Sequence, residues 1–225
     1  MKAKLIVMLT NNDVTVENAK EVFESCSDIN EVQLWGFKNV GLPKNKMCDL
    51  VETMKKAGKT TFLEVVTYKE EECLEAAMLA VECGFDYLCG TLFYDSVWQY
   101  LKDKPIKYQP FIGEVYGSPS VLEGSIYGIV AEAKKLEEKG VSGFDLLAYR
   151  YTGNAEILAE NCVENMDSDV VMAGSIDTKE RIEKVNEINP WGYTMGSALF
   201  KKMFVADGSF RDNLQEVVNV MKNIA

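Results

Sequence analysis

The sequence has 225 residues, is 47% hydrophobic, and carries a formal net charge of −11 from 24 Lys and Arg against 35 Asp and Glu. This length suits one barrel or one to two smaller domains, and the negative charge argues against a nucleic-acid-binding surface. The chain has no His, which excludes Ser-His-Asp triads and most zinc or iron sites, so we expect neither a metal nor a cofactor.

The N-terminal segment and the cysteines indicate the compartment. The apolar run within Met1–Leu9 meets Asn11–Asp13 at once, which makes it too short for a signal peptide. No stretch approaches the length of a membrane span. The six cysteines are scattered among core-like residues without a C-x-x-C motif. We expect a cytoplasmic protein without membrane contact, whose cysteines are reduced, buried thiols rather than disulfides.

In the first half of the chain, short apolar segments alternate with segments of helical periodicity. We predict strands at 4–10, 31–35, 60–66 and 86–91, each followed by a helix, the fourth helix being short. Pro43 fits the first turn of the second helix, and Gly58 marks its end. Thr67 and Glu70 have the spacing of a capping box for the third helix, which stops at Gly84.

The second half repeats this alternation. We predict strands at 107–113, 143–150, 170–176 and 192–198, and helices that end near 140, 165 and 224. The longest loop runs from Glu114 to Gly124. Asp177 and Glu180 predict a capped helix after the seventh strand.

These eight strands are largely continuous apolar runs, as strands buried on both faces should be. Eight alternating units without a linker predict an α/β fold, a single-domain (β/α)8 TIM barrel over residues 1–225. A doubly wound open sheet is the alternative.

Two neighbouring strands end in Gly-Ser. Gly174-Ser175 and Gly196-Ser197 follow the last two strands, where such barrels most often hold a phosphate. A strand that ends in Gly lets a ligand approach its backbone, and two such turns present N–H groups and hydroxyls together. We expect a phosphate site there, with two simple strand-to-helix turns as the alternative.

A similar pattern occurs four strands earlier. Tyr87-Leu-Cys-Gly90-Thr91 matches Tyr193-Thr-Met-Gly196-Ser197. This match suggests a second, weaker anion site at Gly90-Thr91, although short matches also arise by chance.

Catalytic groups in a barrel come from the C-terminal ends of the strands. Glu64 stands in an apolar strand, where burial would raise its pKa toward values useful for proton transfer. Lys38, after the neighbouring strand, could pair with it, polarise a carbonyl or form a Schiff base. The alternative is a structural ion pair that braces the barrel mouth. We predict that Glu64 faces the barrel interior, since a lone carboxylate among outer aliphatic side chains would lack a partner.

Two further strand ends carry polar groups. Arg150 follows a run of core residues and could hold a phosphate or carboxylate through two parallel bonds, or else pair with a neighbouring carboxylate. Asn11 is a candidate catalytic residue after the first strand. Asn11 and Asp13 also fit ordinary turn and capping chemistry.

The pair Ala173-Gly174-Ser175-Ile176 and Gly196-Ser197-Ala198 resembles the phosphate-binding barrel superfamily. That superfamily includes the phosphoribosyl isomerase of histidine synthesis, N-acetylmannosamine-6-phosphate 2-epimerase and indole-glycerol-phosphate synthase, and the glycerol-responsive antiterminator family looks similar. The resemblance implies that the two Gly-Ser turns take a substrate phosphate. The aspartates that the histidine-pathway isomerase uses after strands 1 and 5 have no counterpart here.

Two hypotheses follow. The first is a metal-independent isomerase, epimerase or lyase of the aldolase type that moves protons next to the carbonyl of a small phosphorylated sugar, with Glu64 as acid/base and Lys38 as electrophile. The second is a non-catalytic sensor of a phosphorylated metabolite that regulates a protein partner. Lys38 and Glu64 converging on the phosphate cavity would favour the enzyme. Either reading is compatible with a homo-oligomer.

Overall fold

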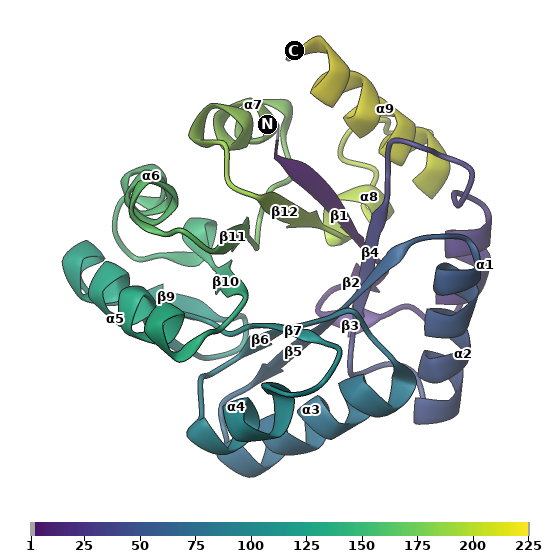
Figure 1. The fold of residues 1–225 in the computed structure, drawn as a ribbon. Coiled ribbons are helices and arrows are strands. Elements are labelled where there is room, and N and C mark those ends of the chain that lie inside the picture. The colour runs from purple at the N-terminus through teal and green to yellow at the C-terminus, as the bar shows by residue number, and fades with distance from the viewer. Residues whose placement is uncertain (1–2, 225) are drawn as a thin grey trace.

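The computed structural model describes residues 3–224, in which eight parallel strands form one curved sheet surrounded by helices (Figure 1). In ring order the strands are β1 (Lys4–Met8), β4 (Leu34–Lys38), β5 (Thr60–Thr67), β6 (Tyr87–Thr91), β7 (Lys107–Gln109), β10 (Gly143–Leu146), β11 (Asp169–Met172) and β12 (Gly192–Met195). The ring is completed between β7 and β10, where Phe111 bridges Asp145 and the Asp145 amide donates to the Pro110 carbonyl at 3.0 Å. The ring follows chain order, which confirms the single-domain (β/α)8 barrel and rules out the open sheet.

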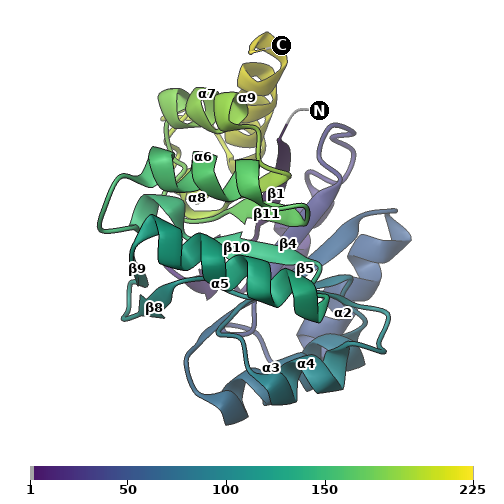
Figure 2. The same ribbon diagram turned by 60° about the vertical axis from the view of Figure 1, so that its left-hand side comes forward.

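The helices cover the outside of this ring, and α5, α6 and α7 lie side by side along one flank (Figure 2). Their bounds are α1 (Ala19–Glu24), α2 (Lys44–Lys56), α3 (Glu70–Cys83), α4 (Asp95–Leu101), α5 (Ile126–Lys139), α6 (Ala155–Asn165), α7 (Lys179–Ile188), α8 (Ser197–Phe200) and α9 (Phe210–Asn223), with a 3-10 turn η1 (Ala148–Arg150). None of the helices within residues 3–224 is long and apolar enough to cross a membrane.

Two small hairpins rise from the C-terminal mouth of the barrel. The first joins β2 (Thr10–Asn11) to β3 (Val14–Thr15), and the second joins β8 (Glu114–Tyr116) to β9 (Val121–Glu123). The second hairpin occupies the segment expected as the longest loop. Both sit where barrels of this kind build their ligand sites.

Inward and outward side chains form two separate cores. The outward faces of the strands pack against the helices, whereas a small cluster fills the lower barrel interior. This inner cluster consists of Ile6, Met8, Leu34, Phe62, Tyr87, Cys89 and Val171, with Trp191 packed against it. Above this inner cluster the inward-facing side chains are polar, and a cavity opens there.

Several sequence-based boundaries were wrong by a few residues. β4 runs from Leu34 to Lys38 rather than over residues 31–35, so Lys38 is the last residue of the strand itself. The sixth strand of the ring stops at Leu146, and the chain then forms a 3-10 turn that ends at Arg150. The second change reflects side-chain burial that continues through Leu147 and Ala148 past the end of strand pairing, which hydrophobic patterns alone cannot separate.

Both predicted capping boxes were also wrong. The N-cap of α7 is Thr178, whose side chain accepts from the Arg181 amide at 3.2 Å, so Asp177 lies outside the helix. β5 continues through Thr67, whose hydroxyl contacts Glu72, and α3 starts after Lys69 without a side-chain cap.

The cysteine prediction fails at one pair. Cys48 on α2 and Cys83 at the end of α3 form a disulfide, with Cα atoms 4.5 Å apart. The two cysteines are 35 residues apart and lie on the helices of two successive strand–helix units. The bond therefore joins two helices that pack against each other. The four free cysteines, Cys26, Cys73, Cys89 and Cys162, are buried, as expected of core thiols.

Gly36 shows how tightly the barrel interior is packed beside the site. A Cβ placed there would lie 2.7 Å from Met8 Sδ and 2.9 Å from the Phe62 carbonyl oxygen. We expect Gly36→Ala to lower the free energy of unfolding by about 1–3 kcal/mol through overpacking, measured by urea denaturation. Gly128→Ala on α5, where Ser125 Oγ is the nearest atom at 3.0 Å, should change it by no more than about 1 kcal/mol. Equal losses would argue against a tight interior.

Candidate functional site

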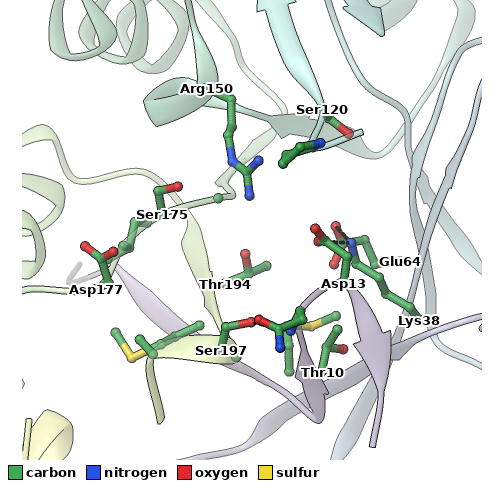
Figure 3. A pocket seen from close by; sticks show the side chains of 18 of the residues that line it. Thr10, Asp13, Lys38, Glu64, Ser120, Arg150, Ser175, Asp177, Thr194 and Ser197 are labelled. Atoms are coloured by element: carbon green, nitrogen blue, oxygen red, sulfur yellow. Dashed lines mark hydrogen bonds and ion pairs between the residues drawn. The ribbon is translucent and has the colours of Figure 1, made fainter. Parts of the chain in front are cut away.

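The main cavity in the described part of the chain lies at the C-terminal mouth of the barrel and has a volume of about 630 Å³. In Figure 3, Asp13, Lys38 and Glu64 gather on one side, Ser175 and Asp177 lie on the other, and Arg150 reaches in between them. Its polar lining consists of Thr10, Asn12, Asp13, Lys38, Glu64, Ser120, Arg150, Ser175, Asp177, Thr194, Ser197 and Lys201.

Lys38 and Glu64 are cross-strand neighbours whose side chains both enter the cavity. They are paired in the register between β4 and β5, and Lys38 Nζ lies 3.5 Å from Glu64 Oε1. Their side chains are 9% and 12% exposed. Glu64 therefore faces the barrel interior, as predicted, because its strand neighbours Leu63 and Val65 face the helices.

Asp13 provides a second carboxylate for Lys38, at 2.9 Å from Nζ to Oδ1. It stands in the two-residue turn of the β2–β3 hairpin, where Asn12 has φ 49° and Asp13 has φ 64°. Tight hairpin turns of this kind require φ > 0 at both central residues, which Asn and Asp tolerate better than most side chains. The Thr15 hydroxyl then fixes Lys38 by accepting from its amide at 2.9 Å and donating to its carbonyl at 2.8 Å.

The charges in this group stabilise one another. Burial alone would lower the pKa of Lys38, but Glu64 and Asp13 outweigh burial, so the pKa is raised and the amine stays protonated. Burial alone would raise the pKa of Asp13, but the bond to Lys38 and the charges of Lys38, Arg150 and Lys201 leave that pKa lowered. The group is thus an ammonium held by carboxylates.

The first Gly-Ser turn packs against Arg150. Gly174 has φ 82° and Ser175 φ 56°, so the chain turns sharply after β11. A Cβ at Gly174 would lie 3.1 Å from Arg150 Cγ, and glycine therefore leaves the space that the arginine stem occupies. The Arg150 Nε has no hydrogen-bond partner within residues 3–224, and the side chain lines the cavity.

The second Gly-Ser turn begins the short helix α8. A Cβ at Gly196 would lie 2.8 Å from the Thr10 carbonyl oxygen, so this glycine permits close packing against the first strand segment. Ser197 and Ala198 are the first two helical residues, and their N–H groups have no preceding carbonyl within the helix. The Ser197 Oγ accepts from the Asn12 amide at 3.0 Å, which joins this turn to the first hairpin.

Three predicted residues lie away from the cavity lining. Asn11 is in β2, and its neighbours Thr10, Asn12 and Asp13 line the cavity in its place, because the hairpin turns just after it. Gly90 and Thr91 do not line it either. The Thr91 hydroxyl is bonded to Tyr108 Oη at 2.7 Å, and a Cβ at Gly90 would lie 2.9 Å from the Val65 carbonyl oxygen. Their Gly-Thr turn thus serves packing against β5, and the second anion site is not supported.

Sequence reasoning named Asp13 at the end of the first strand without assigning it to the site, and missed Asp177 and Lys201 as lining residues. Asp13 was interpreted as part of a turn, which it is, but its place opposite Lys38 depends on a hairpin between strands 1 and 4. Lys201 follows Ser197 by four residues, the spacing that places two side chains on one helical face, and this was the available signal. Asp177 lies beside Ser175 and pairs with Arg181 at 3.0 Å.

Solved structures of other proteins share this fold. Orotidine 5'-phosphate decarboxylase from Pyrococcus horikoshii OT3 matches with a TM-score of 0.71 at 13% identity over 96% of this chain and 99% of that chain. N-acetylmannosamine-6-phosphate 2-epimerase from Clostridium perfringens matches with a TM-score of 0.64 at 11% identity over 100% and 94%. A tryptophan synthase complex from Pyrococcus furiosus matches with a TM-score of 0.71 at 10% identity over 97% and 98%.

The likeness is one of fold. No protein-family model matches the sequence, and no curated protein sequence matches it either. Identities of 10–13% say nothing about which reaction, if any, this chain shares with them.

The ammonium of Lys38 should be needed for stability because of its carboxylate neighbours. We expect Lys38→Met to lower the free energy of unfolding by about 3 kcal/mol, since Glu64 is then buried without a cation. Adding Glu64→Gln should recover part of this loss, as measured by urea denaturation of the single and double variants. Lys201→Met, at an exposed position of the rim, should stay within about 0.5 kcal/mol of wild type. If Lys38→Met costs the same with and without Glu64, the two groups are not coupled.

Proposed function

We propose that the protein is a metal-independent enzyme of the isomerase or epimerase type that moves a proton next to the carbonyl of a small phosphorylated sugar or related metabolite. The observation that carries this proposal is that the Lys38–Glu64 pair and both Gly-Ser turns line the same cavity. Acid–base groups and an anion cradle within one space of about 630 Å³ suit a small ligand with a charged end and a reactive end.

The anion end is formed by the turns after β11 and β12. N–H groups at the start of α8 and the hydroxyls of Ser175 and Ser197 offer hydrogen bonds to phosphate oxygens. Arg150 and Lys201 add two cations to the lining. Because the chain has a net charge of −11, anion binding depends on these local hydrogen-bond donors and cations.

At the reactive end, Lys38 and Glu64 have complementary roles. The protonated Lys38 donates a hydrogen bond to the ligand carbonyl oxygen and stabilises the negative charge that develops on it. The Glu64 carboxylate takes the proton from the adjacent carbon and returns it to the neighbouring carbon or to the same carbon. Asp13 keeps Lys38 charged and oriented, at 2.9 Å from its ammonium.

The charge state of Lys38 favours this chemistry over a lyase that works through a Schiff base. A lysine must be neutral to attack a carbonyl carbon. Two carboxylates beside Lys38 raise its pKa and hold it as an ammonium, which suits an electrophile rather than a nucleophile.

The same geometry bears on the alternative of a non-catalytic sensor. A sensor needs the anion cradle but has no use for a buried ammonium–carboxylate pair aimed into the same cavity. Since Lys38 and Glu64 point into the cavity and not away from it, the enzyme is favoured.

The phosphate end can be tested with inorganic phosphate or sulfate as the probe. Ser197→Asp should abolish binding measured by titration calorimetry, because the new carboxylate repels the anion at short range. Ser120→Asp puts the same charge on another part of the cavity wall and should weaken binding less. Unchanged affinity in Ser197→Asp would place the anion site elsewhere.

The catalytic end can be tested by proton exchange. A panel of aldose and ketose phosphates in deuterated water should show deuterium entering the carbon next to the carbonyl, followed by NMR. Glu64→Gln should slow this exchange by about 10²–10⁴ while phosphate affinity persists. If Glu64 only braces the barrel, the same variant will melt at a lower temperature and exchange protons at the wild-type rate.

A further inference from the structure

A second carboxyl group lies in the barrel interior below the cavity floor. Asp145 on β10 is 1% exposed, and its strand neighbours Phe144 and Leu146 pack outward against the helices. Its register partner on β11, Val171, belongs to the inner cluster. Asp145 therefore points into the barrel, as Glu64 does from β5.

The side chain of Asp145 has no polar partner among residues 3–224. Neither of its carboxyl oxygens has a hydrogen-bond partner in the described chain, and the same holds for both side-chain atoms of Gln109 on β7, which is 0% exposed. An ionised carboxylate that is buried without a partner is far more costly than a neutral carboxylic acid. The burial and the missing contacts thus favour a protonated Asp145.

The ionisable groups around Asp145 also bear on its protonation. The ionisable side chains near it are Lys38 on β4, Glu64 on β5 and Cys89 on β6, with Tyr87, Lys107 and Asp169 at the strand positions below. The inward positions of β1, β7, β11 and β12 around it carry Met8, Gln109, Val171 and Thr194, which do not titrate. Burial, and after it the charge of Glu64, raises the pKa of Asp145 well above its ordinary value, against a smaller opposing effect of Lys38. Burial likewise raises the pKa of the Cys89 thiol, which stays neutral.

We propose that Asp145 carries a proton in the folded protein and that, as a neutral acid, it is a positioning residue for Lys38 and Glu64. With Asp145 neutral, the carboxylates in contact with Lys38 are Asp13 and Glu64, both of which line the cavity. The ammonium is then held at the cavity, facing a ligand. This positioning rests on the proposed function, in which Lys38 meets the carbonyl of the ligand.

The charge of Asp145 can be measured without any ligand. The folded protein binds this proton more tightly than the unfolded chain, in which an Asp titrates near pH 4. Wild type should therefore lose stability relative to Asp145→Asn as the pH rises above about 4. The ratio of the unfolding constant of wild type to that of the variant should grow about tenfold per pH unit, until Asp145 ionises in the folded state. Urea denaturation at a series of pH values gives this ratio.

Asp167→Asn, at an exposed carboxylate, is the matched control and should give a ratio that stays flat across this range. A flat ratio for Asp145→Asn above pH 5 would mean that Asp145 is ionised in the folded protein, and the proposal would be wrong.

A measurement on the unmodified side chain covers the case in which Asp145→Asn does not fold. Infrared spectra of protein labelled with ¹³C-aspartate should show the carbonyl band of a protonated Asp at neutral pH, retained in Asp169→Asn. Absence of that band would overturn the proposal. Neither experiment involves phosphate or turnover, so failure here leaves the proposed function standing, whereas failure of Ser197→Asp or Glu64→Gln leaves the Asp145 proton unaffected.

Discussion

The site depends on a single constraint, which is that a lysine ammonium has been taken almost entirely out of water. Lys38 is 7% exposed, and a cation in that position is tolerable only with carboxylates in contact. Glu64 meets it from the adjacent strand and Asp13 from a hairpin that begins at the end of β1. Three segments of the first third of the chain are thus held together by one charge, and the Thr15 hydroxyl fixes the backbone that carries it.

The opposite wall is built on a different principle. There the glycines make room: Gly174 for the stem of Arg150 and Gly196 for the backbone that follows β1. The resulting turns expose N–H groups and hydroxyls instead of charged carboxylates, apart from Asp177, whose charge is balanced by Arg181. The cavity therefore has one wall set by ion pairing and one set by backbone geometry, which gives a ligand with two chemically distinct ends a single orientation.

The fold could be predicted from the sequence because a barrel repeats one pattern, and apolar strands followed by glycine-terminated helices at Gly84 and Gly140 are local signals. Glu64 and Lys38 were predictable as a pair for the same reason, since neighbouring strands in a barrel are neighbours in sequence. Asp13 was not, because its contact with Lys38 requires a hairpin that folds back over the mouth. Nor was the Cys48–Cys83 bond, which depends on how α2 and α3 pack. Asp145 was not predicted because it stands in an apolar strand, whose inward-facing residues cannot be recognised from alternation.

The hydrogen bond between Asn12 and Ser197 connects the two walls. The Ser197 oxygen accepts a hydrogen bond from the Asn12 amide at 3.0 Å, which leaves the hydroxyl proton of Ser197 free to donate to the anion of the proposed function. Donating and accepting through one hydroxyl strengthens both bonds, since each polarises the other. Under the proposed function, an anion held by this hydroxyl and the Asn12–Ser197 bond would be thermodynamically linked, so that each favours the other by the same factor. Because Asp13 follows Asn12 in that turn and pairs with Lys38, the proposed anion end and the Lys38 ammonium are joined through two residues of backbone.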